Sequence, residues 1–241
     1  MEEFEVRAYE TDPGGELRLL SLINYLEEAA WRNSHALGFS VNHLLEKGVS
    51  WVMQRLKLDV LHWPKHNDLV YVDTWASGLD RFLTYRDFKI YNDRDQLIAT
   101  AKTNWIVLDI QTRRMIRIPE FIKEARFSVD RDNLPLLTEK IAKTEHLEKL
   151  LQYQVLERDI DRNGHVNNAN YFQWCMEGAT GSMKSGSLQS IDMIFKTEAL
   201  RGDELIFYRA DLGNSSYQHV ISNTRTGKDV ILAQTSFQPT I

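Results

Sequence analysis

Two long stretches of the chain place apolar residues every three to four positions, which is the spacing of one buried helix face. The first stretch runs from Leu17 to Gly38, and its apolar stripe consists of Leu19, Leu22, Ile23, Leu26, Ala29 and Ala30. The second follows a polar turn, and its stripe consists of Val166, Ala169, Tyr171, Phe172, Cys175 and Met176. Each stretch therefore predicts a long helix with one face in a core.

Runs rich in β-branched and aromatic residues follow each predicted helix and indicate strands. In the first half, after a short helix at 41–47, they cover residues 51–61, 69–77, 82–91 and 97–108. In the second half they cover residues 190–197, 204–212, 217–223 and 230–238. A further strand precedes each long helix, at residues 4–9 and 152–158.

The segment between the halves has a different character, because residues 119–150 are charged and contain few strand formers. We interpret it as a connection with helical parts at 121–126 and 138–150. A Gly- and Ser-rich loop is expected at 178–187, after the second long helix.

The two halves form an internal repeat with an offset of 149 residues, which aligns Asp12 with Asp161 and Gly15 with Gly164. Each half is predicted to be an antiparallel sheet wrapped around one apolar helix, so the fold class is α+β. The two copies differ in their side chains, because the first has Glu16 where the second has the imidazole of His165. We therefore expect the catalytic residues to lie in the second half.

Composition narrows the functional classes. The chain has 241 residues, a net charge of −5 and one cysteine, which fits a cytoplasmic protein without disulfides and argues against general nucleic-acid binding. The acidic N-terminus does not read as a signal peptide, and no apolar run is long enough to span a membrane. No metal-binding cluster, Walker A loop or dinucleotide-binding motif occurs, so we expect neither a metal nor a cofactor.

Candidate chemistry is concentrated in the turn before the second helix, in the pattern Asp161-x-Asn163-x-His165-x-Asn167-Asn168. A capped turn alone would explain an Asp, an Asn and a Gly, but not an imidazole or further amides in a first helical turn, where Asn is a poor helix former. A functional site is therefore favoured. Gly164 leaves room for close approach of a substrate, and the N–H groups at the helix start, Val166 among them, are natural donors to an oxyanion.

This pattern resembles the D-x-N-x-H-x-N-N motif of acyl-carrier-protein (acyl-ACP) thioesterases, which have two hotdog domains in one chain. Residues 60–78, 105–119 and 195–205 resemble three further segments of that family, in the same order. The resemblance implies a double (tandem) hotdog fold. It also implies an N-terminal hotdog at 1–125 that holds the acyl pocket, a linker at 126–150 and a catalytic C-terminal hotdog at 151–241.

The resemblance also implies an activity, the hydrolysis of long-chain acyl-ACP to free fatty acid and acyl carrier protein. Glu198 matches the position of the family's catalytic Glu, and it would activate water with help from Asn163 and His165. Asp161 would either stabilise charge in the site or attack the thioester directly. Many plant members have Cys next to that Glu, whereas this chain has Ala199, and we expect the single Cys175 to be a buried packing residue.

Several expectations are less specific. The acyl pocket is predicted in the first half, at Ala29, Ala30, Trp31, Trp51 and Met53. A docking site for the acidic carrier protein is predicted at Arg113, Arg114 and Arg117, where a merely solvated face is an equal alternative. Assembly as a homodimer is left open, as are chain length and saturation preference. The rival functions are an acyl-CoA thioesterase on the same scaffold, a non-catalytic acyl-binding hotdog protein and a hotdog dehydratase.

Overall fold

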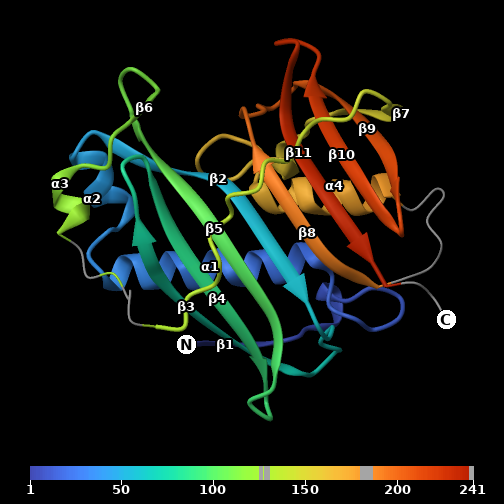
Figure 1. Cartoon of the computed structure of the whole chain (residues 1–241), viewed down its shortest axis with the longest axis horizontal. Helices are drawn as coiled ribbons and strands as arrows, with labels where there is room; N and C mark the ends of the chain where they lie inside the picture. The colour runs from blue at the N-terminus through green and yellow to red at the C-terminus, as the bar shows by residue number, and fades with distance from the viewer. Residues whose placement is uncertain (125–126, 128–130, 180–186, 239–241) are drawn as a thin grey trace. The chain divides into compact units, whose positions relative to one another are not determined.

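The computed structural model describes residues 1–124, 127, 131–179 and 187–238. It divides into two compact units, Met1–Leu137 and Thr138–Ile241, and each contains one long helix and an antiparallel sheet (Figure 1). The boundary between the units falls inside the range predicted as a linker, whose limits stay a prediction.

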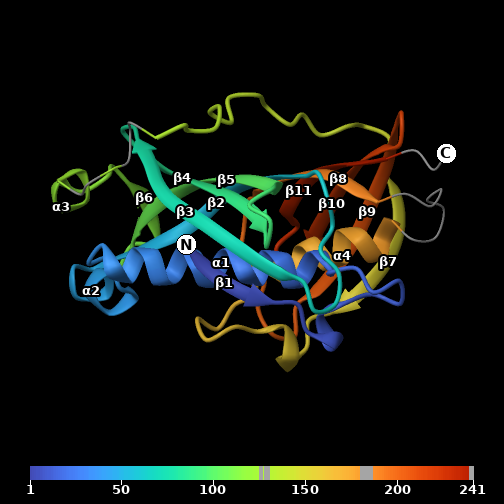
Figure 2. The ribbon, with the colours of Figure 1, turned by 90° about the horizontal axis from the view of Figure 1, so that it is seen from below.

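The first unit is a sheet with strand order β1-β3-β4-β5-β2, and β6 pairs with β5. The strands are β1 (Glu2–Glu5), β2 (Val49–Val60), β3 (Leu69–Leu79), β4 (Leu83–Asn92), β5 (Leu97–Asp109) and β6 (Arg114–Ile116). The helices are α1 (Leu19–Ala36), α2 (Val41–Glu46) and α3 (Glu120–Lys123). Helix α1 lies along one face of this sheet (Figure 2), and it buries the predicted stripe of Leu19, Leu22, Ile23, Leu26, Ala29 and Ala30.

The second unit repeats this order as β7-β9-β10-β11-β8. Its elements are β7 (Glu148–Gln154), α4 (Asn168–Ala179), β8 (Leu188–Phe195), β9 (Glu204–Gly213), β10 (Ser216–Asn223) and β11 (Lys228–Phe237). Helix α4 packs on this sheet through rings such as Trp174, whose centroid lies 5.6 Å from that of Phe207 on β9. The predicted α+β repeat is therefore present in both units.

The strands that precede the long helices end earlier than predicted. Each is followed by a short 3-10 turn, Ala8–Glu10 in the first unit and Glu157–Asp159 in the second. In each turn, an acidic side chain accepts a hydrogen bond from the backbone N–H three residues earlier. Glu10 accepts the Arg7 N–H (2.9 Å), and Asp159 accepts the Leu156 N–H (2.8 Å).

The helix predicted at 138–150 is wrong, because this segment is extended until β7 begins at Glu148. The side chain of Gln218 on β10 explains the conformation. It accepts the Thr144 N–H (2.7 Å) and donates to the Ala142 carbonyl (2.8 Å), which occupies backbone groups that a helix would use. The other predicted helical part begins as α3, whereas Arg126 and residues 180–186 of the predicted Gly/Ser-rich loop lie outside the described residues.

Residues 131–137, here called the strap, cover the face of the first sheet opposite α1 (Figure 2). Beneath the strap, Lys102 Nζ lies 2.6 Å from Asp87 Oδ1, and the two side chains are 3% and 0% exposed. The same groups bind the strap backbone, since Lys102 donates to the Leu134 carbonyl (2.9 Å) and the Leu134 N–H donates to Asp87 Oδ2 (2.7 Å). A buried ion pair loses much hydration, and these extra hydrogen bonds offset part of that cost.

Candidate active site

The turn before α4 is organised by the carboxylate of Asp161. Its Oδ1 accepts the Asn163 N–H (2.8 Å) and, at a longer distance, the His165 N–H (3.4 Å), while its Oδ2 accepts the Asn163 side-chain amide (3.0 Å). The backbone closes the turn through Asp161 N–H to the His165 carbonyl (2.8 Å). Gly164 has a φ of 81°, a left-handed conformation that side chains other than glycine adopt at a cost.

Asn167 and Asn170, two of the amides that suggested a functional site in the sequence, have structural roles. Asn167 caps α4, because its Oδ1 accepts the Ala169 N–H (2.9 Å). Asn170 donates its amide to the Asp159 carbonyl (3.0 Å), which also accepts the Asn167 N–H (2.9 Å). These contacts fix the start of α4 against the preceding 3-10 turn.

The donors at the start of α4 differ from the sequence-based expectation. Val166 is buried, and its N–H already donates to the Ala199 carbonyl (3.0 Å), so it is not open to an oxyanion in this structure. Within the part of the chain that the structure describes, the Asn168 N–H at the first position of α4 donates to no protein acceptor. It is therefore a candidate donor to a ligand at the start of α4, and the sequence pattern gave no reason to prefer it.

The structure brings His165 and Glu198 together from different elements. His165 lies in the turn before α4, and Glu198 lies in the segment after β8. Their side chains meet with His165 Nε2 3.1 Å from Glu198 Oε2, and they are 28% and 37% exposed. The neighbouring hydrogen bond from Val166 to Ala199 joins the two segments directly beside this contact. An imidazole and a carboxylate are thus in contact where solvent can reach both of them.

The first unit contains the same turn in its backbone. Asp12 N–H donates to the Glu16 carbonyl (2.8 Å), Gly15 N–H donates to the Asp12 carbonyl (3.0 Å), and Gly15 has the φ of 81° seen at Gly164. The Leu17 N–H donates to the Pro64 carbonyl (2.8 Å), as Val166 does to Ala199. The offset of 149 residues read from the sequence therefore corresponds to a repeated hydrogen-bond pattern.

The side chains on the two copies differ. Glu16 occupies the position of His165, and Trp63, one residue before Pro64, occupies the position of Glu198. The imidazole–carboxylate contact is consequently a property of the second unit alone. A folded turn of this kind does not require that contact, so its presence in one unit calls for a functional explanation.

The thiol of Cys175 is 2% exposed on α4, as predicted for a packing residue. Burial raises the pKa of the Cys175 thiol well above its usual value, which disfavours the thiolate that a nucleophile needs.

We expect Cys175→Ala to lower the free energy of unfolding by about 1 kcal/mol through lost packing, while the rate of the reaction stays within a few-fold of wild type. Chemical denaturation and steady-state kinetics on the same preparation measure the two effects. Loss of all activity in a folded Cys175→Ala protein would contradict the packing role and point to a thiol nucleophile.

The residues predicted for the acyl pocket lie in different surroundings. Ala29, Ala30 and Met53 are buried in the first unit. Trp51 packs against a hydrophobic cluster that includes Val107, whereas Trp31 is 43% exposed. Their role stays a prediction. The predicted docking residues, Arg113, Arg114 and Arg117, are all exposed around the hairpin that joins β5 to β6.

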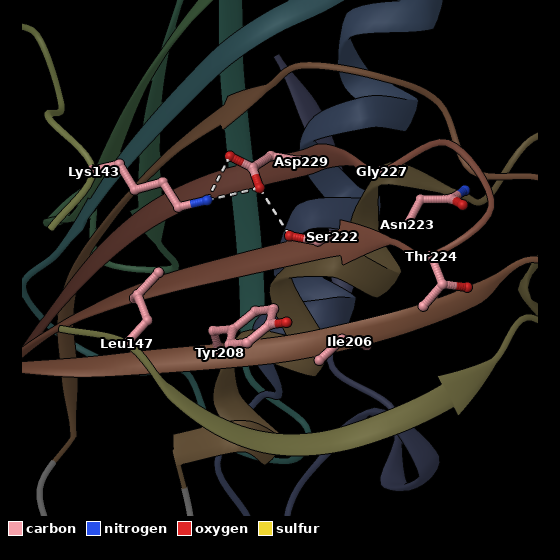
Figure 3. Close-up of a pocket in the computed structure, with 9 residues that line it drawn as sticks. All are labelled: Lys143, Leu147, Ile206, Tyr208, Ser222, Asn223, Thr224, Gly227 and Asp229. Carbon is pink, nitrogen blue, oxygen red and sulfur yellow. Dashed lines mark hydrogen bonds and ion pairs between the residues drawn. The ribbon is translucent and has the colours of Figure 1, made fainter. Parts of the chain in front are cut away.

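A separate groove of about 450 Å³ opens on the second unit between Lys143, Leu147 and strands β9 to β11 (Figure 3). Asp229 in this groove binds Lys143 Nζ through both carboxylate oxygens (2.9 and 3.0 Å) and accepts the Ser222 hydroxyl (2.8 Å). None of the four predicted catalytic residues lines the groove, so it is distinct from the His165–Glu198 contact.

Membrane-spanning helices and metal-binding clusters were sought among the described residues. No helix among them is both long and apolar enough to cross a membrane. Across the same residues, no group of three or more His, Cys, Asp or Glu side chains is arranged to hold a metal ion.

Comparison with known proteins finds two family models on this chain. The acyl-ACP thioesterase N-terminal domain matches residues 1–125, and the acyl-ACP thioesterase C-terminal domain matches residues 142–239. Together they cover most of the chain, and the second match contains the whole candidate site.

Curated relatives are distant in sequence. A chloroplastic palmitoyl-acyl carrier protein thioesterase of Gossypium hirsutum is 24% identical, over 99% of this chain and 63% of that protein. A chloroplastic dodecanoyl-[acyl-carrier-protein] hydrolase of Cinnamomum camphora is 25% identical, over 98% of this chain and 66% of that protein. The chain thus spans slightly less than two thirds of the length of these relatives.

Solved structures share the fold over nearly the whole chain. An acyl-ACP thioesterase from Bacteroides thetaiotaomicron superposes with a TM-score of 0.84 at 22% identity, covering 98% of this chain and 96% of that one. The 12:0-ACP thioesterase from Umbellularia californica gives a TM-score of 0.82 at 22% identity, covering 99% and 96%. The double hotdog fold predicted from the sequence is confirmed.

Proposed function

Because the chain belongs to the acyl-ACP thioesterase family, we propose that it hydrolyses long-chain acyl-ACP to a free fatty acid and the carrier protein. The observation that carries the proposal is the contact of 3.1 Å between His165 Nε2 and Glu198 Oε2. The contact lies beside the turn of Asp161 and Asn163, and the otherwise similar turn of the first unit lacks it.

In the proposed mechanism, Glu198 accepts a proton from a water molecule as the water oxygen attacks the thioester carbonyl carbon. His165 holds Glu198 in place, takes this proton from Glu198 and passes it to the departing thiolate when the carbon–sulfur bond breaks. The Asn168 N–H and the positive end of the α4 dipole would stabilise the oxyanion. The alternative in which Asp161 attacks the carbonyl keeps the same residues, with Glu198 activating the water that then cleaves the acyl-enzyme anhydride.

The carrier protein is proposed as the partner because the family is defined by acyl-ACP substrates. The chain has a net charge of −5, so an acidic partner would need a local basic surface. We propose that the exposed side chains of Arg113, Arg114 and Arg117 supply it.

The function is tested with matched palmitoyl-ACP, palmitoyl-CoA and 3-hydroxypalmitoyl-ACP. Release of free thiol from palmitoyl-ACP, with a higher kcat/KM than from palmitoyl-CoA, supports the proposal. Preference for palmitoyl-CoA would favour the acyl-CoA thioesterase. Water loss from the hydroxyacyl substrate would favour a dehydratase, and binding of acyl-ACP without thiol release would favour an acyl-binding protein.

Chain-length selectivity is expected to depend on the first unit. We propose that the acyl tunnel runs beside α1. Ala29 and Ala30 are buried on this helix, so enlarging either to Phe would shorten the proposed tunnel, and each excluded methylene forfeits ~0.8 kcal/mol. We expect Ala29→Phe or Ala30→Phe to shift the profile from stearoyl-ACP towards octanoyl-ACP while turnover of short chains persists.

The matched control is Ala169→Phe on α4, because Ala169 is equally buried in the second unit. Each folded variant is profiled across the same series of acyl-ACP chain lengths. An unchanged profile for both α1 variants, together with a shift for Ala169→Phe, would place the pocket in the second unit instead.

A further inference from the structure

The β8–β9 loop (residues 196–203) is closed in the same way as the β2–β3 loop of the first unit. Asp203 Oδ2 accepts the Leu200 N–H (2.9 Å), and the Leu200 carbonyl accepts the Asp203 N–H (3.0 Å). In the first unit Asp68 accepts the Lys65 N–H (2.7 Å), and the Lys65 carbonyl accepts the Asp68 N–H (3.0 Å). The turn itself therefore belongs to the repeated architecture.

In the second unit the β10–β11 hairpin also reaches the carboxylate that closes the loop. Arg225 donates from Nε to Asp203 Oδ1 (2.6 Å) and from Nη2 to Asp203 Oδ2 (3.0 Å). The side-chain amide of Asn223 donates to Asp203 Oδ2 (2.6 Å). A guanidinium that binds a carboxylate through two charge-assisted hydrogen bonds holds it strongly and in a defined orientation. Asp203 thereby joins the hairpin to the β8–β9 loop.

The Asp203 carboxylate is charged although its side chain is only 4% exposed. The hydrogen bond from Arg225 lowers the pKa of Asp203 below its usual value, against the opposing effect of burial, and the hydrogen bonds from Leu200 and Asn223 lower it further. A buried carboxylate needs such partners, because an unpaired charge is costly to remove from water. Asp203 is thus an ionised acceptor for the Leu200 N–H at neutral pH.

The β4–β5 hairpin of the first unit contains the same turn. Asn92 Oδ1 accepts the Arg94 N–H (3.0 Å), just as Asn223 Oδ1 accepts the Arg225 N–H (2.9 Å). An asparagine and an arginine therefore recur two residues apart at both hairpins. The partners of these side chains can be compared directly between the units.

The link from hairpin to loop is missing in the first unit. The side-chain amide of Asn92 donates to Gln96 (2.9 Å) and not to Asp68. Within the part of the chain that the structure describes, the exposed side chain of Asp68 accepts a hydrogen bond only from the Lys65 N–H, and Arg94 is exposed. The link therefore occurs in the unit that holds the imidazole–carboxylate contact and not in the other.

One peptide group of the β8–β9 loop connects this link to the candidate active site. The carbonyl of Ala199 accepts the Val166 N–H (3.0 Å), and the N–H of the same peptide group donates to Asp203 (2.9 Å). Val166 directly follows His165 in the chain, and Ala199 directly follows Glu198. Both polar ends of the peptide group are therefore held, one by the catalytic turn and the other by the carboxylate that the hairpin binds.

We infer that Arg225 is a positioning residue that acts through Asp203 on the carboxylate of Glu198. Without the guanidinium, Asp203 would lose its charged partner and the β8–β9 loop would lose its connection to the hairpin. Because Glu198 is 37% exposed, its contact with His165 depends on the orientation of the backbone that bears it. A small misplacement of a catalytic group lowers the rate more than it lowers substrate binding. The inference rests on the proposed function for this kinetic consequence.

The test is Arg225→Met, which removes the guanidinium from a side chain that is 57% exposed and so leaves the core packing intact. We expect kcat on palmitoyl-ACP to fall roughly tenfold, with KM within about twofold of wild type, because the loss concerns geometry in the transition state. Arg225→Lys keeps the charge without the paired hydrogen bonds and should return kcat to within roughly threefold of wild type. In a Glu198→Gln background, Arg225→Met should cause no further loss of kcat.

The matched control is Arg94→Met, which makes the same change in the equivalent hairpin of the first unit and should leave kcat unchanged. The unfolding midpoint is measured for each variant, because loss of the partner of a buried carboxylate is expected to destabilise Arg225→Met as well. A folded Arg225→Met protein with a lower midpoint but wild-type kcat would overturn the inference. A loss of kcat that adds fully to that of Glu198→Gln would overturn it too.

A readout that does not depend on activity is the imidazole ¹H–¹⁵N spectrum of His165, assigned by comparison with His165→Asn. Arg225→Met should shift these resonances in the direction that Glu198→Gln does, whereas Arg94→Met should not. If the wild-type protein cleaves no thioester, the proposed function fails. The His165 resonances then decide separately, since a shift in Arg225→Met would still support the positioning role and unchanged resonances would overturn it.

Discussion

Glu198→Gln is expected to lower kcat on acyl-ACP by roughly 10²–10⁴, which is the usual contribution of a positioned general base. The amide is nearly isosteric with the carboxylate and can still contact His165, but it cannot accept a proton from water at neutral pH. Steady-state kinetics with palmitoyl-ACP measure the loss, and circular dichroism shows whether the fold is retained.

The matched control for this substitution is Glu157→Gln in the same unit. Glu157 is also exposed and also paired with a basic side chain, since its Oε2 lies 2.7 Å from Arg201 Nη1. We expect Glu157→Gln to keep the wild-type rate. Full activity in Glu198→Gln would mean that the base has been assigned to the wrong residue.

Asp161→Asn should cause a second loss of roughly 10²–10⁴ in kcat. Its carboxylate accepts from both the backbone and the side-chain amide of Asn163, so an amide at this position would place two donors against each other. The substitution removes the negative charge, or the nucleophile, on either version of the mechanism. The kinetic assay is the same as for Glu198→Gln.

The equivalent turn of the first unit offers a control that separates the effect of a substitution on turn stability from its effect on catalysis. Asp12 accepts the Glu16 N–H (3.0 Å) in the equivalent turn of the first unit. Asp12→Asn should therefore weaken a similar turn while leaving kcat unchanged. Equal losses in kcat for Asp12→Asn and Asp161→Asn would show that the effect comes from the stability of the turns and not from the site.

Much of the fold could be predicted because its main signals are local. The apolar stripe placed the first helix at 17–38, and α1 spans Leu19–Ala36. The helix expected at 138–150 failed because its Lys- and Glu-rich composition favours a helix, whereas Gln218, about 75 residues further along the chain, holds the backbone extended. Strand β6 was missed because it has three residues and depends on pairing with β5.

In the candidate site, too, features set by neighbouring residues could be predicted, whereas contacts between distant segments could not. Asp161, Asn163 and His165 share one turn, so their proximity follows from the sequence alone. Glu198 was assigned through family resemblance, because nothing local indicates that it would reach His165. The occupied N–H of Val166 could not be foreseen, since its acceptor lies in another segment.

The strap has a consequence for dividing the protein into separately expressed halves. A fragment that ends at residue 125, the limit of the first predicted domain, would leave out residues 131–137. It would open to water the face on which Asp87 and Lys102 are buried, and both would lose their hydrogen bonds to Leu134. A fragment of residues 1–137 retains that cover. The strap therefore acts as a built-in lid over the buried Asp87–Lys102 pair, and removing it would expose that pair to water.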